Sequence, residues 1–297
     1  MISRAARSEH VSGWLFVAPA ALLIGIFGIL PIGWAALLSF QNNDLLTTPT
    51  WVGTQNYHTL VNDPVFRQSV NHTIVYTLLF VPLSVGGSLA LAMLLNARIR
   101  FSWFYRTAVF IPVATSTVAT GLIFNWLLEP TYGVANYLLG KVHLGPYGFF
   151  QNPDQALYSI VAMTVWGWLG FDVIVYLAAL QGVPESLVEA ARLDGAGRWA
   201  TFRHVVFPLV SPATLFLIVW STINALQVFD EIYVTTRGGP LHATTVMVYY
   251  LYSQAFEFFH AGYAAAIAVV LFIAIAAITL VQLRLTRERS ATGQVRS

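Results

Sequence analysis

Polar and aromatic side chains recur inside long apolar stretches of this chain, where they could bind a solute. Between residues 209 and 233, Trp220, Asn224, Gln227 and Glu231 follow helical spacing and would share one helix face. Amides and carboxylates hydrogen-bond hydroxyl groups, and aromatic faces cover C–H surfaces, so this mixture suits a sugar. The alternative is that the polar groups bond helix to helix and the tryptophans only pack.

The same reasoning applies to the neighbouring apolar stretches, where Thr117, Gly121 and Asn125 would share a face. An aspartate that faces lipid at a helix centre costs about 2.5–3.5 kcal/mol, so polar residues here should face the protein interior. The candidate path residues are Asn125, Trp126, Trp168, Asp172, Trp220, Asn224, Gln227, Asp230 and Glu231.

Asp172 could relay protons, as in a stand-alone secondary transporter, or it could line the path or be the partner of a polar group on another subunit. No second acid, histidine or lysine lies near it at the predicted mid-membrane level, so a relay would have no next member. The residues therefore favour a structural or path-lining role.

The sequence lacks the residues that several kinds of chemistry require. The chain has no cysteine, and its apolar stretches carry neither a Ser/His pair nor a His/Glu metal spacing, so we expect no catalytic and no metal-binding residues. The one Gly-Lys pair, Gly140-Lys141, has Ala135 and Val142 where a phosphate loop needs Gly and Ser or Thr. We therefore expect neither an enzyme nor an ATP site in this chain. The formal net charge of only +2 gives no reason to expect nucleic acid as a partner.

The composition indicates an all-α membrane protein surrounded by lipid. Hydrophobic residues make up 57% of the chain and charged residues 9%, whereas a soluble domain carries roughly a quarter charged residues. No stretch shows the two-residue alternation of a membrane β-barrel. Six stretches approach or exceed the roughly 20 residues that cross a bilayer as a helix: 14–40, 70–95, 104–128, 157–181, 209–233 and 263–283.

Basic residues predict the orientation of these spans. Twelve of the fifteen lysines and arginines lie before the first span, between the second and third, between the fourth and fifth, or after the sixth. Basic residues collect on the cytoplasmic side, so both termini should be cytoplasmic. We accordingly divide the chain into a cytoplasmic N-terminus (1–13), a six-helix membrane domain (14–285) and a cytoplasmic tail (286–297).

The cytoplasmic segment 182–208 is the densest charged stretch between two spans. Pro184 suits a helix start, Glu185 favours the positive end of the helix dipole, and Gly195 suits a helix stop. A second helix should cover about 198–207 and lie amphipathically on the membrane. This pattern predicts either a handle for a soluble partner or an ordinary connector.

This segment resembles the EAA motif of permease subunits of ATP-binding-cassette importers. The match consists of Glu189-Ala190-Ala191, then three residues, Gly195, nine residues and Val205-Val206-Phe207-Pro208. The segments 177–184, 193–196 and 236–245 are similar to the carbohydrate branch of that family, the relatives of the maltose permease. The resemblance extends over about residues 14–285 and implies the type I importer permease fold.

The resemblance also implies partners. A second homologous permease would complete the pore, and two ATPase subunits would supply ATP and Mg²⁺, with no cofactor in this chain. An extracytoplasmic binding protein would deliver the solute at the cell or inner membrane. The residues implied to couple to the ATPases are Glu185, Glu189, Ala190, Ala191, Asp194 and Gly195, and those implied to dock the binding protein are Gly238, Gly239 and Pro240.

The substrate that the resemblance implies is a sugar or sugar-like solute. The alternative is glycerol 3-phosphate or a glycerophosphodiester, because permeases of the same branch carry such esters. No lysine or arginine lies well inside a predicted span, which favours a neutral sugar.

Overall fold

The computed structural model describes residues 14, 16–97 and 101–294, and it confirms a helical membrane fold. Five of the described helices are long and apolar enough to cross a membrane: Phe16–Leu38, Pro64–Asn96, Pro153–Gln181, Arg198–Leu226 and Ala261–Leu285. A sixth span is a bent pair, Trp103–Ala114 and Thr117–Leu127, whose axes differ by 102°. The described chain therefore has up to six spans, and the N-terminal segment 1–13 lies outside the described residues.

The bend corrects the predicted continuous span 104–128. Helix α5 (Ser102–Ala114) ends at Thr115, and both Thr115 and Ser116 have extended backbone before α6 (Thr117–Leu127) begins. Pro112, which has no N–H to donate, lies one turn before this break. Apolar residues resume directly after Thr115, Ser116 and Thr117, so the prediction from overall hydropathy ran across the break.

The predicted span 209–233 is also divided. Helix α11 (Phe207–Leu226) ends at Leu226, and the short helix α12 (Asp230–Thr235) begins after a three-residue break. Phe229 in that break has φ −143° and ψ −57°, outside the helical region. Trp220 and Asn224 remain one turn apart on α11, whereas Glu231 lies on α12. The prediction that these three residues and Gln227 share one helix face is therefore wrong.

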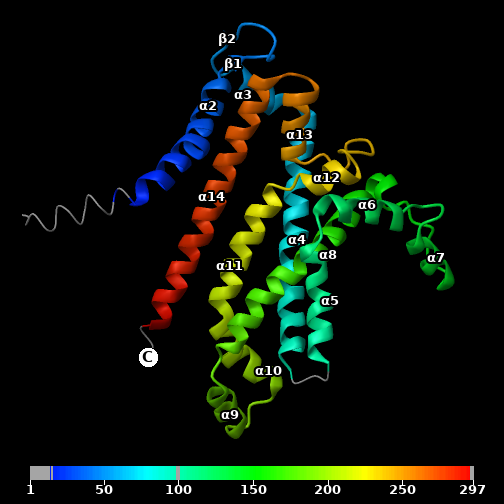
Figure 1. Cartoon of the computed structure of the whole chain (residues 1–297), viewed down its shortest axis with the longest axis vertical. Helices are drawn as coiled ribbons and strands as arrows, with labels where there is room; N and C mark the ends of the chain where they lie inside the picture. Colours follow the sequence, from blue (N-terminus) through cyan, green and yellow to red (C-terminus); the bar gives the residue numbers. More distant parts are fainter. Residues whose placement is uncertain (1–13, 15, 98–100, 295–297) are drawn as a thin grey trace, which may run out of the picture. The chain divides into compact units, whose positions relative to one another are not determined.

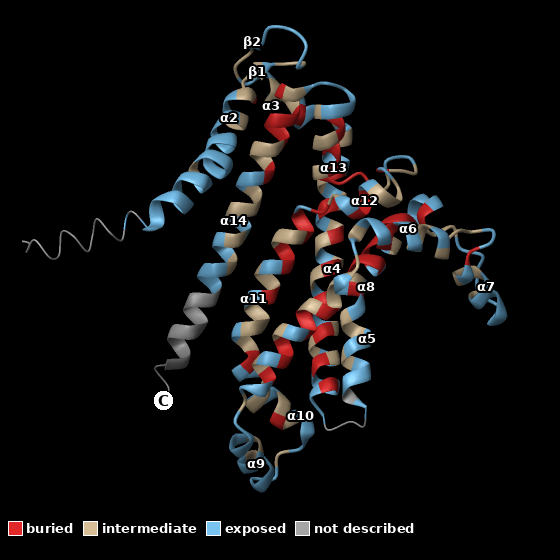
Figure 2. Ribbon diagram, viewed as in Figure 1, coloured by how far each residue is buried: buried red, intermediate tan, exposed pale blue. Residues whose placement is uncertain are grey.

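Two compact units make up the chain, and each is described by itself. The first contains residues up to Asp63 and residues 251–272, with η1 (Gly25–Ile29), α2 (Leu30–Leu38), α3 (Gln55–Asn62), η4 (Ser253–Glu257) and the start of α14 (Ala261–Gln294). The strands β1 (Gln41–Asn42) and β2 (Thr50–Trp51) pair antiparallel, with Gln41 opposite Trp51. No side chain in the most apolar part of Phe16–Leu38 is buried, as the pale blue α2 in Figure 2 shows.

Backbone contacts hold the first unit together. The Asn56 side-chain amide donates to the carbonyl oxygens of Ser39 and Gln41, at 2.8 and 2.9 Å. Gly262 at the start of α14 lies so close to the Gln41 carbonyl that a Cβ there would be 1.9 Å from its oxygen. Glycine is therefore required where α14 meets the hairpin.

The second unit contains residues 64–250 and 273–297. Helix α4 (Pro64–Asn96) packs on α8 (Pro153–Gln181) and α11, and α5 packs on α8 (Figure 1). The remaining elements are α7 (Val134–Lys141), η2 (Phe149–Gln151), α9 (Glu185–Leu193), α10 (Arg198–Thr201), η3 (Phe202–Val206), α13 (Met247–Tyr252) and the second part of α14.

The buried residues of α4 and α8 form the centre of the second unit (Figure 2). One apolar cluster surrounds Tyr76 and Ile160, and another surrounds Val173 and Leu217. Helix α8 begins where the Asn152 side chain accepts a hydrogen bond from Asp154 N at 2.8 Å, with Pro153 in the first turn. This capped helix lies at the centre of the second unit.

Candidate functional site: a cavity at two helix breaks

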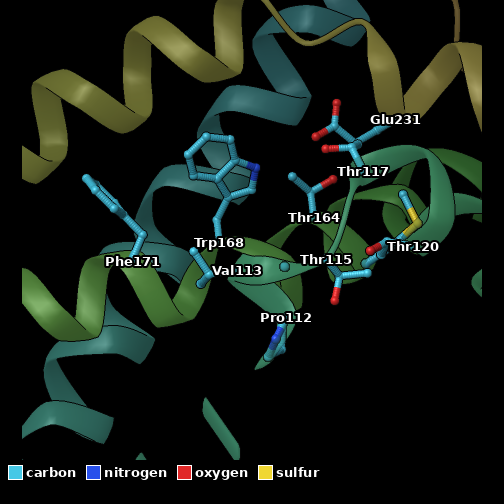
Figure 3. Close-up of a pocket in the computed structure, with 11 residues that line it drawn as sticks. Pro112, Val113, Thr115, Thr117, Thr120, Thr164, Trp168, Phe171 and Glu231 are labelled. Carbon is cyan, nitrogen blue, oxygen red and sulfur yellow. The ribbon is translucent and has the colours of Figure 1, made fainter. Parts of the chain in front are cut away.

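Two adjoining cavities lie in the second unit, where the α5–α6 bend and the α11–α12 break meet α8. Their volumes are about 270 and about 190 Å³. Both are lined by Thr117, Thr164, Trp168 and Glu231, which come from α6, α8 and α12. Figure 3 shows these four side chains around one space, with Val113 and Phe171 beside Trp168. Each cavity therefore depends on chain segments that are distant in sequence.

Close packing of α6 on α12 positions the two helix breaks. A Cβ on Gly121 would lie 2.8 Å from Val234 Cγ1, so a larger residue would push α12 away. The Asn125 amide donates to the Val234 carbonyl at 3.2 Å. These two contacts fix α12, and thereby Glu231, relative to α6.

The bend itself is held against α8 by another glycine. A Cβ on Gly170 would lie 2.5 Å from both the Val109 carbonyl oxygen and Val113 Cγ2. This close contact fixes α5 on α8 at Gly170. The chain turns away just after the contact, where α5 ends, and this turn leaves space in front of Trp168.

Polar groups alternate with aromatic groups on the cavity walls. Glu231 is 9% exposed and lines both cavities together with Trp168. The second cavity adds Asn224, Gln227 and Asp230 from the end of α11 and the start of α12. Hydroxyl, amide, carboxylate and indole groups can together hydrogen-bond and cover a polyhydroxylated ring.

The structure brings together five of the nine candidate path residues: Trp168, Asn224, Gln227, Asp230 and Glu231 line the cavities. Asn125 instead forms the α6–α12 contact described above. Trp126 is 63% exposed and lines neither cavity. Trp220 stacks on Phe216 and makes a tilted contact with Phe171, at ring-centroid distances of 6.2 and 5.8 Å.

Asp172 lies away from both cavities. It is 1% exposed, and its carboxylate accepts a hydrogen bond from Ser84 Oγ on α4 at 2.5 Å. The pair joins the two most central helices of the second unit. This geometry is that of a bond between helices.

Sequence reasoning missed the lining residues Thr120, Thr164 and Tyr76. A lone threonine in an apolar helix commonly bonds its own backbone, and Thr164 Oγ1 does donate to the Ile160 carbonyl at 2.9 Å. The spacing of Thr117 and Thr120, three residues apart, is the one signal that could have indicated a polar face.

A second region of interest is the cytoplasmic segment predicted at 182–208. Helix α9 covers Glu185–Leu193, as expected, and Gly195 has φ +85°. Ala196 N donates to the Ala191 carbonyl at 2.9 Å, which closes the helix end around this left-handed glycine. The stop at Gly195 is therefore confirmed. The second helix is longer than predicted, since α10, η3 and α11 continue as one helix from Arg198 to Leu226.

The candidate coupling residues lie on or directly after α9. Glu185, Glu189, Ala190, Asp194 and Gly195 are exposed, and Ala191 is half-buried. A groove of about 720 Å³ separates α9 from the ends of α4 and α8, and it is lined by Met93, Asn96, Ala97, Leu180, Gln181, Val183, Glu185, Val188, Glu189, Arg192 and Val206.

The candidate docking residues lie in a tightly bonded loop after α12. The Thr244 and Thr245 hydroxyls donate to the carbonyls of Gly239 and Gly238, at 2.7 and 3.1 Å. Gly238 is buried with φ +78°, whereas Leu241 next to Pro240 is 84% exposed. The loop thus holds an apolar side chain outward on a fixed backbone.

Known proteins similar to this chain include two curated relatives and one solved transporter. The lactose transport system permease protein LacF of Rhizobium radiobacter is 36% identical, covering 95% of this chain and 96% of the relative. The sn-glycerol-3-phosphate transport system permease protein UgpA of Pectobacterium atrosepticum is 32% identical, covering 94% and 96%.

A chain of the bacterial alginate transporter, solved with an alginate pentasaccharide-bound periplasmic protein, has the same fold. Its TM-score is 0.83 at 22% identity, covering 95% of this chain and 96% of that chain. A family model described as the binding-protein-dependent transport system inner membrane component matches residues 83–289. This chain therefore belongs to the family of binding-protein-dependent transport system inner membrane components, the permease subunits of ATP-binding-cassette transporters.

Proposed function

We propose that this chain is the permease subunit of an ATP-driven importer that moves a sugar or sugar-like solute into the cytoplasm. The observation that carries the proposal is the pair of cavities at the helix breaks, lined by an indole, amides, threonines and a carboxylate. A hydrated ring needs such hydrogen-bonding partners in place of water. The sugar named for LacF supports the same class of solute.

The partners follow from what the described chain supplies. A second homologous permease would contribute the rest of the path, and two ATPase subunits would contact Glu185, Glu189, Ala190, Ala191, Asp194 and Gly195. These ATPases would bind ATP and Mg²⁺, and this chain would bind no cofactor. An extracytoplasmic binding protein would dock at Gly238, Gly239 and Pro240, beside the exposed Leu241.

The proposed orientation places both termini in the cytoplasm of a cell or inner membrane. Arg192, Arg198 and Arg203 then lie on the cytoplasmic side with α9. The loop that carries Leu241 lies on the opposite side, where a binding protein can reach it.

The α9 region suits force transmission. The hydrogen bond from Ala196 N to the Ala191 carbonyl caps the C-terminal end of α9. The next helix runs without interruption from Arg198 to Leu226. Gln227, which lines the second cavity, follows directly after Leu226. Movement of α9 by the ATPases would therefore shift the cavity wall and favour either the inward-open or the outward-open packing.

Purification of the tagged chain from its native membrane tests the proposal. We expect an ATPase and a second permease to co-purify in stoichiometric amounts. Uptake into vesicles should require ATP on the side of the membrane that α9 faces and the binding protein on the opposite side. A chain that transports alone on an ion gradient would contradict the proposal and favour a secondary transporter.

The second candidate substrate is glycerol 3-phosphate or a glycerophosphodiester, which the name of UgpA favours. Uptake assays with labelled lactose and labelled sn-glycerol 3-phosphate, each with the cognate binding protein, separate the two candidates. The acidic residues Asp230 and Glu231 among the cavity-lining side chains favour the sugar.

A further inference from the structure

The charged side chains around the two cavities differ from those that a path for phosphate esters would need. Among the described residues, no lysine, arginine or histidine lines either cavity. Glu231 lines both, and Asp230 lines the second. An anionic solute would meet only side chains that are neutral or acidic.

Glu231 is held in place by its surroundings. Its side chain is more than nine-tenths buried, and Figure 3 shows its carboxylate directed from α12 toward Trp168 and Thr164. The Asn125 and Gly121 contacts fix the helix that carries Glu231, and Trp168 lines the same two cavities. The carboxylate is therefore held at the cavity wall by the packing of α12 on α6.

We propose that Glu231 is a specificity-determining residue that admits uncharged, hydroxyl-rich solutes and repels anions from this part of the path. This inference rests on the proposed function of the cavity. An ionised carboxylate accepts hydrogen bonds from sugar hydroxyls. The same charge repels a phosphate or carboxylate, and the repulsion grows as surrounding water is displaced.

Relatives named for a neutral and for an anionic substrate are both similar to this chain. A relative named for lactose and one named for sn-glycerol 3-phosphate are similarly identical to it, at 36% and 32%. Overall identity therefore does not distinguish a neutral from an anionic substrate, whereas a fixed carboxylate in a cavity without basic side chains does.

The chain has no cysteine, so a single introduced thiol reports the local charge. In the assembled transporter, Thr117→Cys places the thiol in both cavities, and Thr50→Cys places one on an exposed strand as a reference. We would measure labelling rates with two methanethiosulfonates of similar size, one bearing trimethylammonium and one bearing sulfonate. Mass spectrometry measures the labelling of this chain separately from the other subunits.

We expect the cation-to-anion rate ratio at Thr117→Cys to exceed that at Thr50→Cys. Adding Glu231→Gln should lower the ratio at Thr117→Cys by about fivefold or more, the scale of one unit charge a few ångströms away. Glu231→Asp should largely keep the ratio, because it keeps the charge. Glu257→Gln, at an exposed glutamate in the other unit, should leave the ratio unchanged.

Two results would overturn the inference. If Glu231→Gln leaves the ratio at Thr117→Cys unchanged while lactose and its binding protein protect the thiol, the path is correct but Glu231 does not select by charge. If the thiol is unreactive in every nucleotide state, the cavity is closed to solutes, and both the inference and the proposed path fail.

Discussion

The α9 segment and the cavity differ in how the chain builds them. The α9 segment is continuous in sequence, exposed and charged, with its helix end closed by local hydrogen bonds. The two cavities are assembled from side chains of α4, α6, α8, α11 and α12, with two helix breaks at their walls. In the proposed function, the ATPases contact the α9 segment, and the solute replaces water in the cavities.

The difference implies that the two regions can be impaired separately. Changes on α9 should stop transport without altering what the cavity binds. Changes in the cavity should lower transport while the complex still assembles. The predictions below test that separation.

The largest effect is expected for Glu189→Lys. Glu189 is exposed on α9 and also lines the groove beside α8, so charge reversal alters the surface that the ATPases are proposed to hold. We expect uptake to fall more than tenfold, which corresponds to more than about 1.4 kcal/mol. The amount of chain in the membrane should not change, and protection of Thr117→Cys by substrate should persist.

Glu257→Lys provides a control with the same charge change at an exposed glutamate outside α9. Normal uptake in Glu189→Lys would remove Glu189 from the coupling surface. A loss of substrate protection in the same variant would show that the two regions are not separable.

Two tryptophans distinguish the cavity from the rest of the apolar surface. Trp168 lines both cavities, whereas Trp126 lines neither and is 63% exposed. Trp168→Ala should raise the solute concentration needed for half-maximal uptake about tenfold, or about 1.4 kcal/mol, because it removes the aromatic surface that lines both cavities. Trp126→Ala should change uptake less than twofold. Equal effects of the two variants would contradict the placement of the path.

The contrast between these tryptophans shows what sequence could and could not predict. Local signals predicted α9 and its stop, because a proline, a glycine and charged residues act within one turn of the chain. The breaks at 115–116 and 227–229 were missed because each is a short interruption inside a stretch that is mostly apolar, and its few polar residues, such as Thr115, Ser116 and Gln227, also occur within membrane helices.

The cavity residues were predicted only in part for the same reason. Trp126 and Trp168 both lie in apolar helices, and their own neighbours in sequence do not show which one faces a cavity. Tertiary contacts decide this, such as the approach of Gly170 to Val109. A single sequence does not encode such a contact in any short spacing.

The bend can be tested through that glycine. Gly170→Ala would place a Cβ 2.5 Å from the Val109 carbonyl, so α5 must shift at a cost of about 1–3 kcal/mol. We expect a lower melting temperature of the purified complex and slower labelling of Thr117→Cys. Gly167→Ala lies one turn earlier on α8, where a Cβ would have no atom within 4 Å, and should leave the melting temperature unchanged. Equal melting temperatures for the two variants would contradict the close α5–α8 contact.

The smallest effect is expected at Asp172, the acid that the structure places outside the cavity. Asparagine retains an oxygen that can accept the Ser84 hydroxyl, so Asp172→Asn should keep uptake within about twofold of the unmodified chain. Asp172→Leu removes the acceptor and should lower stability by about 1 kcal/mol, the scale of a hydrogen bond between membrane helices. Uptake and melting temperature measured together separate these two effects. Abolished uptake in a stable Asp172→Asn complex would instead indicate that the carboxylate itself acts during transport, and the division between a solute cavity and a bonded helix core would have to be redrawn around Asp172.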